Sequence, residues 1–122
     1  MAKSQPLIHG RHYHVYNRGI NGEILFREKR NYAYFLKLYA QYIEPIAETY
    51  AYCLMSNHFH FLLRIREGDQ DQHLSNGGRS LQASQAFSSL FSTYTKAFNK
   101  AFERTGSLFQ KPFRRNLIAD DL

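Results

Sequence analysis

The amino-acid sequence predicts an α+β domain in which a single four-stranded antiparallel sheet carries two helices on one of its faces. Three observations support this prediction. Short segments rich in strand-forming residues alternate apolar with polar positions, which is typical of strands. Two longer segments repeat apolar residues at the 3.6-residue spacing of a helix. Glycine, proline or asparagine separates one kind of segment from the next.

The first half of the chain gives a strand followed by a helix. Arg11–Asn17, RHYHVYN, alternates and favours a strand, which Arg18–Gly22 interrupts. Glu28–Glu44 then repeats apolar positions at helical spacing, and Pro45 ends the predicted helix because proline lacks the backbone N–H that a helix interior needs. The apolar positions are Tyr32, Phe35, Leu36, Tyr39, Tyr42 and Ile43.

A predicted hairpin follows this helix. Thr49–Met55 favours a strand, Ser56 and Asn57 favour a tight turn, and His58–Arg66 favours a returning strand. The polar stretch Glu67–Ser80 holds three glycines and shows no apolar periodicity, so we expect a long exposed loop there.

A second helix and a last strand complete the predicted fold. Leu81–Arg104 carries an apolar helical stripe, Gly106 provides a helix stop, and Phe113–Ala119 favours a fourth strand. The resulting order, β-α-β-β-α-β, is that of the ferredoxin-like fold, which places both helices on one face of the sheet. The stripe consists of Phe87, Leu90, Phe91, Tyr94, Phe98, Ala101 and Phe102.

Length and composition agree with one domain over residues 1–122, without internal repeats. The chain is 43% hydrophobic, has no apolar run of about 18 residues that would predict a membrane helix, and begins without the apolar block of a secretory signal. Cys53 is the only cysteine, which excludes an internal disulfide and makes the cytoplasm the expected location.

The charge balance favours a polyanionic partner. Sixteen Lys and Arg residues against ten Asp and Glu residues give a formal net charge of +6 and a pI near 9.6. A solvated basic surface explains the same numbers without any partner. The nine Tyr and ten Phe residues likewise fit either a packed core or base stacking.

The candidate site is the pair His58 and His60 on the third predicted strand. Because strand side chains alternate between faces, Phe59 and its apolar neighbours should pack against the helices, and the histidines should project from the face without helices. Residues two apart lie roughly 6–7 Å from each other along a strand, which lets both imidazoles converge on one metal ion.

The first predicted strand adds His12, His14 and Tyr16 to the same open face if it pairs with the third. We expect these two histidines to face solvent or to form hydrogen bonds rather than to bind metal, and we assign no role to His9 or His73 in the loops. Most His-x-His pairs bind no metal, so a hairpin with ordinary polar side chains facing outward is the alternative interpretation.

Several spaced motifs are more specific than the histidine pair. HYHVYNRG (His12–Gly19), AYCLMSNHFHFLL (Ala51–Leu63), TYTKAFN (Thr93–Asn99) and GSLFQKPFRRNLI (Gly106–Ile118) occur in that order over nearly the whole chain. Together they resemble the IS200-like single-tyrosine transposases of the HUH endonuclease superfamily, specifically their REP-associated branch.

The resemblance implies an enzyme of DNA transposition. In such transposases a His-hydrophobe-His motif and a third polar side chain hold a divalent ion, Mg²⁺ or Mn²⁺, which polarises the scissile phosphate of single-stranded or hairpin DNA. A tyrosine attacks that phosphate, forms a 5′-phosphotyrosine bond and frees a 3′-hydroxyl, so the strand can be rejoined without ATP. By position, His58 and His60 are the implied metal ligands and Phe59 is the hydrophobe between them. Family members often form dimers, so a homodimer is expected as well.

The sequence departs from this family at its C-terminal end. In relatives the catalytic tyrosine lies on a further helix, in a segment resembling Tyr-Ile-x-x-Asn-Pro, and an Asn or Gln one turn later is the third metal ligand. Ala119–Leu122 contains no such segment, so we expect a truncated core or a nucleophile from elsewhere. Tyr94 is the in-chain substitute, but its place on the apolar stripe predicts a packing role. Tyr16 is better placed than Tyr94, on the open face with the histidines, but it matches no family nucleophile.

Other side chains are candidates for contacts with DNA phosphates. Each has a solvated surface position as its ordinary explanation, and Asn57 occupies a turn where asparagine is favoured for backbone reasons alone. The candidates are Arg11, Asn17, Arg18, Lys111, Arg114 and Arg115.

Three functions compete on this evidence. The leading one is a transposase-type domain that nicks and joins single-stranded DNA. The second is a non-catalytic module that recognises hairpin DNA, which the missing tyrosine favours. The third is a two-histidine phosphoesterase of another kind, but that class uses two separate His-x-Ser/Thr motifs, and the sequence lacks such a pair.

Overall fold

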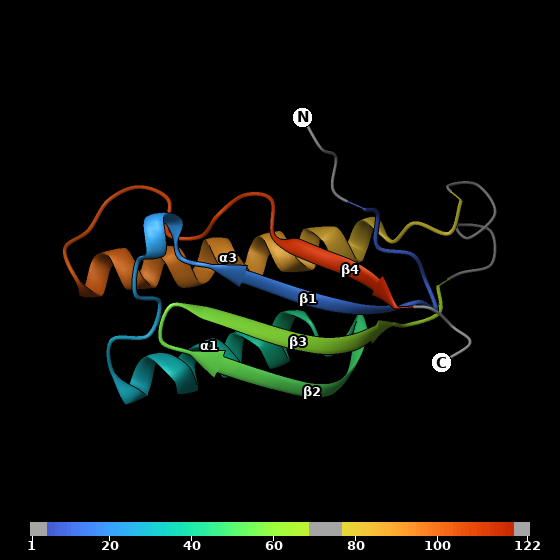
Figure 1. Cartoon of the computed structure of the whole chain (residues 1–122), viewed down its shortest axis with the longest axis horizontal. Helices are drawn as coiled ribbons and strands as arrows, with labels where there is room; N and C mark the ends of the chain where they lie inside the picture. Colours follow the sequence, from blue (N-terminus) through green and yellow to red (C-terminus); the bar gives the residue numbers. More distant parts are fainter. Residues whose placement is uncertain (1–4, 69–76, 119–122) are drawn as a thin grey trace.

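The structure, a computed structural model, describes residues 5–68 and 77–118 (Figure 1). Its four strands form one sheet in the order β2-β3-β1-β4, and every neighbouring pair is antiparallel. The strands are β1 (His12–Arg18), β2 (Ala47–Met55), β3 (His58–Ile65) and β4 (Arg114–Ile118). The helical elements are the short 3-10 helix η1 (Ile20–Gly22), α1 (Lys29–Tyr42) and α3 (Leu81–Ala101).

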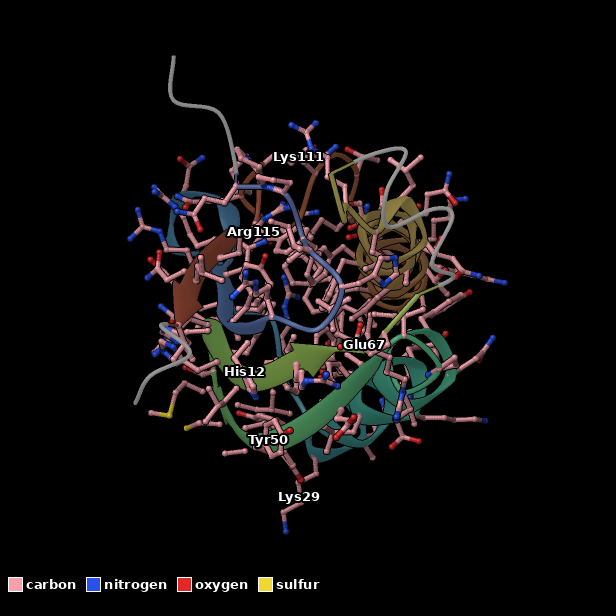
Figure 2. All side chains as sticks on the ribbon, turned by 90° about the vertical axis from the view of Figure 1, so that its right-hand side faces the viewer. His12, Lys29, Tyr50, Glu67, Lys111 and Arg115 are labelled. Atoms are coloured by element: carbon pink, nitrogen blue, oxygen red, sulfur yellow. The ribbon has the colours of Figure 1, made fainter. Side chains whose placement is uncertain are left out.

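Both α-helices lie on the same side of the sheet, as Figure 2 shows with the helices seen nearly end-on. The predicted ferredoxin-like α+β fold is therefore confirmed. Neither α-helix of the described residues combines the length and the apolar character needed to cross a membrane.

Several element boundaries differ from the sequence prediction. The second predicted helix ends at Ala101 rather than Arg104, because Glu103 adopts left-handed backbone with a φ of 51°. β2 begins at Ala47, and an irregularity between Thr49 and Ala51 leaves Tyr50 outside the regular pairing. Most of the predicted loop over 67–80, including His73, and the last predicted strand residue Ala119 lie outside the described residues.

Local signals in the sequence explain where the helices start. The side chain of Ser80 accepts a hydrogen bond from the backbone N–H of Ala83 and caps α3. Glu28 and Asn31 form a reciprocal capping box at the start of α1. Each cap satisfies backbone donors that the first helical turn leaves without partners.

The core lies between the helices and one face of the sheet. β3 buries alternate residues, and its burial follows the predicted period of two. From α1 the core receives Phe35, Leu38 and Tyr39, and the apolar stripe of α3 packs against the same face of the sheet. The buried side chains of the sheet are Tyr13, Val15, Phe59, Phe61, Leu63 and Ile65. The opposite face of β3 stays open.

The turn between β2 and β3 is fixed to the end of β1. The backbone N–H of Gly19 donates to the carbonyl of Asn57 at 3.0 Å, and that of Leu25 donates to the carbonyl of Ser56 at 2.8 Å. A Cβ at Gly19 would overlap the carbonyl of Glu23, so only glycine fits this close approach. This anchoring holds the first residue of β3, His58, in a defined place.

Candidate metal and nucleic-acid site

His58 and His60 project from the open face at one end of β3. Their partners across the ladder are residues of β1, Arg18 opposite His58 and Tyr16 opposite His60. The adjacency of the first and third strands that the sequence analysis required is confirmed. Both imidazoles are partly exposed, so a small ion or a phosphate can reach them.

The two imidazole rings are close enough to bind one ion. Their centroids lie 5.2 Å apart and their planes are nearly perpendicular, at 87°. A ring centre sits roughly 3.2 Å from an ion that its nitrogen binds at about 2.1 Å. Two rings that share an ion therefore have centroids no more than about 6.4 Å apart. The observed separation satisfies this limit.

A neighbouring side chain orients the ring of His58. Its Nδ1 lies 2.9 Å from the Oδ1 of Asn57, in the turn that precedes β3. An amide oxygen only accepts, so this Nδ1 carries the proton and donates it. The neutral ring then keeps its lone pair on Nε2, the nitrogen that a metal ion would use.

A histidine of β1 forms a hydrogen bond with the ring of His60, and either nitrogen can be the donor. The Nδ1 of His60 lies 2.9 Å from the Nε2 of His14, and the two rings stack with centroids 5.1 Å apart. Burial lowers the pKa of His60, and the neighbouring His14 and His58 lower it further. A neutral His60 that donates from Nδ1 also keeps its Nε2 for an ion.

The described residues supply two nitrogen donors and no further cluster. Within 5–68 and 77–118, no group of three or more His, Cys, Asp or Glu side chains is arranged to hold a metal ion. Imidazole nitrogen is a better donor for a first-row transition ion than for Mg²⁺, which prefers oxygen. Of the two ions that the sequence analysis expects, the donor set therefore suits Mn²⁺ better.

The histidines lie in an open cleft of about 690 Å³, here called the histidine cleft. None of the described residues that line it is acidic, and it contains the two arginines Arg18 and Arg114. Such a cleft attracts a polyanion, since no carboxylate on its walls repels phosphate. Its lining consists of Tyr16, Asn17, Arg18, Gly22, Asn57, His58, His60, Gln110 and Arg114.

Tyr16 is one of the residues that line this cleft. Its ring stacks on His14 at 4.6 Å and on His60 at 5.8 Å between centroids, and Arg114 faces it from β4. The ring is partly buried under these neighbours. Tyr16 is thus the described tyrosine that lies beside the two histidines.

Tyr94 lies in the core, on the other side of the sheet. Its side chain is 1% exposed, and its hydroxyl donates a 2.5 Å hydrogen bond to the backbone carbonyl of Leu25. Burial raises the pKa of Tyr94, and Tyr32 adds to the shift. The hydroxyl is therefore both enclosed and hard to ionise, which agrees with the packing position that its helical stripe predicts.

Asn17, expected from the sequence to contact DNA, is buried. Its side chain is 3% exposed, its Nδ2 donates to the carbonyl of Gln110, and its Oδ1 accepts from the N–H of Arg18. This geometry speaks against a direct contact with DNA. Instead Asn17 ties the segment before β4 to the end of β1, which places Gln110 in the cleft.

The basic candidates separate into three locations. Arg18 and Arg114 line the histidine cleft, whereas Arg11 precedes the opposite end of β1. That end is about 20 Å away along a seven-residue strand. Arg115 points to the helix side of β4 and lies with Lys111 beside two other cavities. The structure thus brings two of the five predicted basic side chains to the histidines.

Three contributing residues were not assigned to the site from the sequence. Asn57 had a sufficient explanation as a turn residue, and His14 was expected to be solvent-facing or hydrogen-bonded. Gln110 carried no signal at all. Only its fold-back beside β1, through the hydrogen bond from its N–H to the carbonyl of Arg18, brings it there.

Comparison with known proteins gives a similarity to a solved structure but none to a family or a curated protein. Neither a protein-family model nor a curated relative matches the sequence. Among solved structures, a REP-associated tyrosine transposase bound to a REP hairpin is similar over 98% of this chain, with a TM-score of 0.64 and 17% sequence identity. At that identity the similarity shows a shared fold. The chain spans 63% of the length of that transposase chain.

Proposed function

We propose that this chain is a transposase-type domain that binds single-stranded or hairpin DNA on its open face. It nicks and rejoins that DNA with the help of a divalent ion at His58 and His60. The observation that carries the proposal is the arrangement of the two imidazoles. Each has its Nδ1 within 2.9 Å of a neighbouring polar atom, inside a cleft whose described walls are not acidic. When each Nδ1 donates to that neighbour, its Nε2 is left for an ion. The shared fold with a hairpin-bound transposase supports DNA as the partner.

Each residue of the cleft has a role in this proposal. A bound Mn²⁺ or Mg²⁺ supplies positive charge that polarises a phosphoryl oxygen. His58 and His60 hold the ion, while Asn57 and His14 keep the two rings in their binding orientation. Arg18 and Arg114 are exposed cations that bind the neighbouring phosphates.

The attacking tyrosine is not Tyr94 in this proposal. Tyr94 is enclosed by the core, and its hydroxyl already donates to Leu25. All nine tyrosines of the sequence lie within the described residues, and none is an accessible match to the family nucleophile. The proposed nucleophile is therefore a tyrosine that is not among these 122 residues and that reaches the phosphate from the open face. Its phenol has an ordinary pKa near 10, so it needs the charge of the ion or a nearby base to attack at neutral pH.

A nicking assay tests this proposal. The protein, in a form that includes the proposed nucleophilic tyrosine, is incubated with an end-labelled hairpin that carries a single-stranded flank, with and without Mn²⁺. Covalent protein–DNA adduct is measured on a denaturing gel. We expect His58→Ala and His60→Ala to lose both adduct and Mn²⁺ affinity. His12→Ala is the matched control, because His12 lies on the same face but stacks on Tyr50, away from the cleft. Unchanged Mn²⁺ affinity in both test variants would remove the proposed site.

A second candidate is a module that binds hairpin DNA without cutting it. The observation in its favour is that Tyr94, the in-chain substitute for the family nucleophile, is buried. This candidate predicts hairpin binding with no adduct at any Mn²⁺ concentration. Adduct formation excludes it.

The homodimer expected from the resemblance stays a prediction, and so does the cytoplasmic location expected from the single cysteine. Sedimentation of the protein at several concentrations, with and without hairpin DNA, measures the oligomeric state directly. A dimer would place two histidine clefts in one assembly and allow each chain to supply its partner with a nucleophile.

A further inference from the structure

A second cavity lies on the helix side of the molecule, beside β4. It is a groove of about 900 Å³ between α3 and the segment 106–113, which runs back along the helix before it enters β4 (Figure 1). We call it the α3 groove. Nothing in the proposed nicking mechanism uses it.

The groove has an apolar floor and a polar rim. The floor is made by Phe91, Phe109 and Phe113, with ring centroids 4.9 Å apart between Phe91 and Phe109 and 5.5 Å apart between Phe91 and Phe113. Phe91 and Phe113 are only partly buried, so part of each ring faces the groove. On the rim, one face of α3 presents Ser84, Ser88, Ser92, Thr95 and Lys96.

The charged side chains that line the described part of the groove are all basic. Lys96, Lys111 and Arg115 line it, and none of its described lining residues is acidic. Arg115 lies 3.7 Å above the ring of Phe113, and its Nε is buried without a hydrogen-bond partner. Among the described residues, its terminal nitrogens contact the backbone carbonyls of Gln5 and Phe113, at 3.3 and 3.5 Å. No carboxylate of the described residues forms an ion pair with this guanidinium.

The α3 groove is connected to the histidine cleft around the edge strand β4. A third cavity of about 590 Å³ lies between them. It shares Tyr16, Gln110 and Arg114 with the histidine cleft. With the α3 groove it shares the segment 110–113 and Arg115, and none of its described lining residues is acidic either. A continuous cationic path therefore leads from the two histidines, over β4, into the groove.

We propose that the α3 groove binds unpaired nucleotides of the same DNA strand that lies in the histidine cleft. This inference rests on the proposed function, since it extends the DNA path from the histidines. The aromatic floor contacts bases through their faces, which only an unpaired strand exposes. Lys96, Lys111 and Arg115 neutralise phosphates, and the hydroxyls of the rim donate to phosphate oxygens. A duplex would present only its phosphates to this groove and would leave the aromatic floor unused.

A short and a long oligonucleotide test the two DNA contacts separately, because only the long one can reach from the histidine cleft into the α3 groove. Binding of dye-labelled oligo-dT of about 5 and about 20 nucleotides is measured by fluorescence anisotropy, since sites of this kind cover roughly 4–16 nucleotides. We expect Lys96→Glu to weaken binding of the long oligonucleotide roughly fivefold to tenfold and to reduce its salt slope by about 0.7 per lost phosphate contact. The short oligonucleotide, held in the histidine cleft, should bind unchanged. Lys37→Glu on α1, exposed and outside all three cavities, is the matched control.

The outcomes are distinct. If the unaltered protein binds neither oligonucleotide, the proposed function fails and the inference fails with it. If it binds both but Lys96→Glu behaves as Lys37→Glu, the inference alone is overturned. A benzophenone attached at Ser88→Cys, in a Cys53→Ser background, should cross-link to the long oligonucleotide. Cross-links to a second copy of the chain instead of to DNA would identify the groove as a protein interface and would also overturn the inference.

Discussion

Replacement of Tyr94 by phenylalanine tests whether its hydroxyl stabilises the fold or takes part in DNA cleavage. The substitution removes one oxygen from a side chain that is 1% exposed, and with it the 2.5 Å hydrogen bond to the carbonyl of Leu25. Leu25 is itself fully buried, so the carbonyl loses its described partner and gains no water. A net hydrogen bond contributes about 1 kcal/mol, and a buried acceptor left alone costs about 1–3 kcal/mol. We therefore expect Tyr94→Phe to lower the free energy of unfolding by about 2 kcal/mol.

This loss of unfolding free energy corresponds to a measurable fall in the melting temperature. Unfolding entropy of about 2.1 cal/mol/K per residue gives about 0.26 kcal/mol/K for 122 residues. The melting temperature should therefore fall by about 8 °C. Tyr42→Phe is the matched control, because its hydroxyl makes only a 3.2 Å contact with Thr93 at a partly buried position. The control should lose less than about 1 kcal/mol.

The same substitution is then tested for DNA cleavage below the melting temperature, in a form of the protein that includes the proposed nucleophilic tyrosine. We expect the amount of covalent protein–DNA adduct formed with Mn²⁺ to be unchanged, because the Tyr94 hydroxyl is enclosed and its pKa is raised by burial. Unchanged stability together with lost adduct would show that the hydroxyl acts in the chemistry, and would refute the packing argument.

Three further substitutions test how the site is supported. Asn57→Ala should lower Mn²⁺ affinity about 10–100-fold without a change in the melting temperature larger than a few degrees, because it removes the acceptor that orients His58; isothermal titration measures this. Glu23→Gln should lower the free energy of unfolding by about 1.5–3 kcal/mol at pH 7, because Arg104 binds both oxygens of the Glu23 carboxylate. Arg104 lowers the pKa of Glu23, so the carboxylate contributes its full stability above the unfolded pKa near 4.5. Urea melts of both proteins should show that their difference in unfolding free energy shrinks as the pH falls below that value. Gly19→Ala should destabilise the fold by more than about 2 kcal/mol, because its new Cβ overlaps the carbonyl of Glu23; a loss below 0.5 kcal/mol, on the order of a surface change, would contradict the close approach.

The period-two pattern of β3 was enough to predict which side chains form the core and which face solvent. Phe59 and Phe61 are buried and His58 and His60 are partly exposed, as alternation requires. Such local patterns are readable because a strand reverses its side chains at every residue whatever the rest of the chain does. The same rule explains why Asn17 is buried. It follows Val15 by two residues and therefore belongs to the buried face, a signal that its polar character obscured.

The support of the histidines was not predictable in the same way. The hydrogen bond between His14 and His60 joins residues 46 positions apart, and it depends on the register of β1 against β3. Register is set by the packing of the whole sheet, since a slip of one residue would turn His14 to the opposite face. Gln110 enters the cleft only because the connection from α3 folds back against β1. Single-sequence patterns contain no information about either contact.

The two consecutive arginines of β4 connect the two proposed DNA contacts. Arg114 points to the histidine cleft and Arg115 to the α3 groove, because successive residues of a strand face opposite sides. Charges on an edge strand also prevent pairing with other chains, which explains their presence without DNA. The two explanations differ in one measurable way. If both arginines bind phosphate, Arg114→Gln should weaken short and long oligonucleotides alike, whereas Arg115→Gln should weaken only the long one. If they serve only to protect the edge, both variants should bind DNA normally and aggregate more readily, and the DNA path over β4 would have no support.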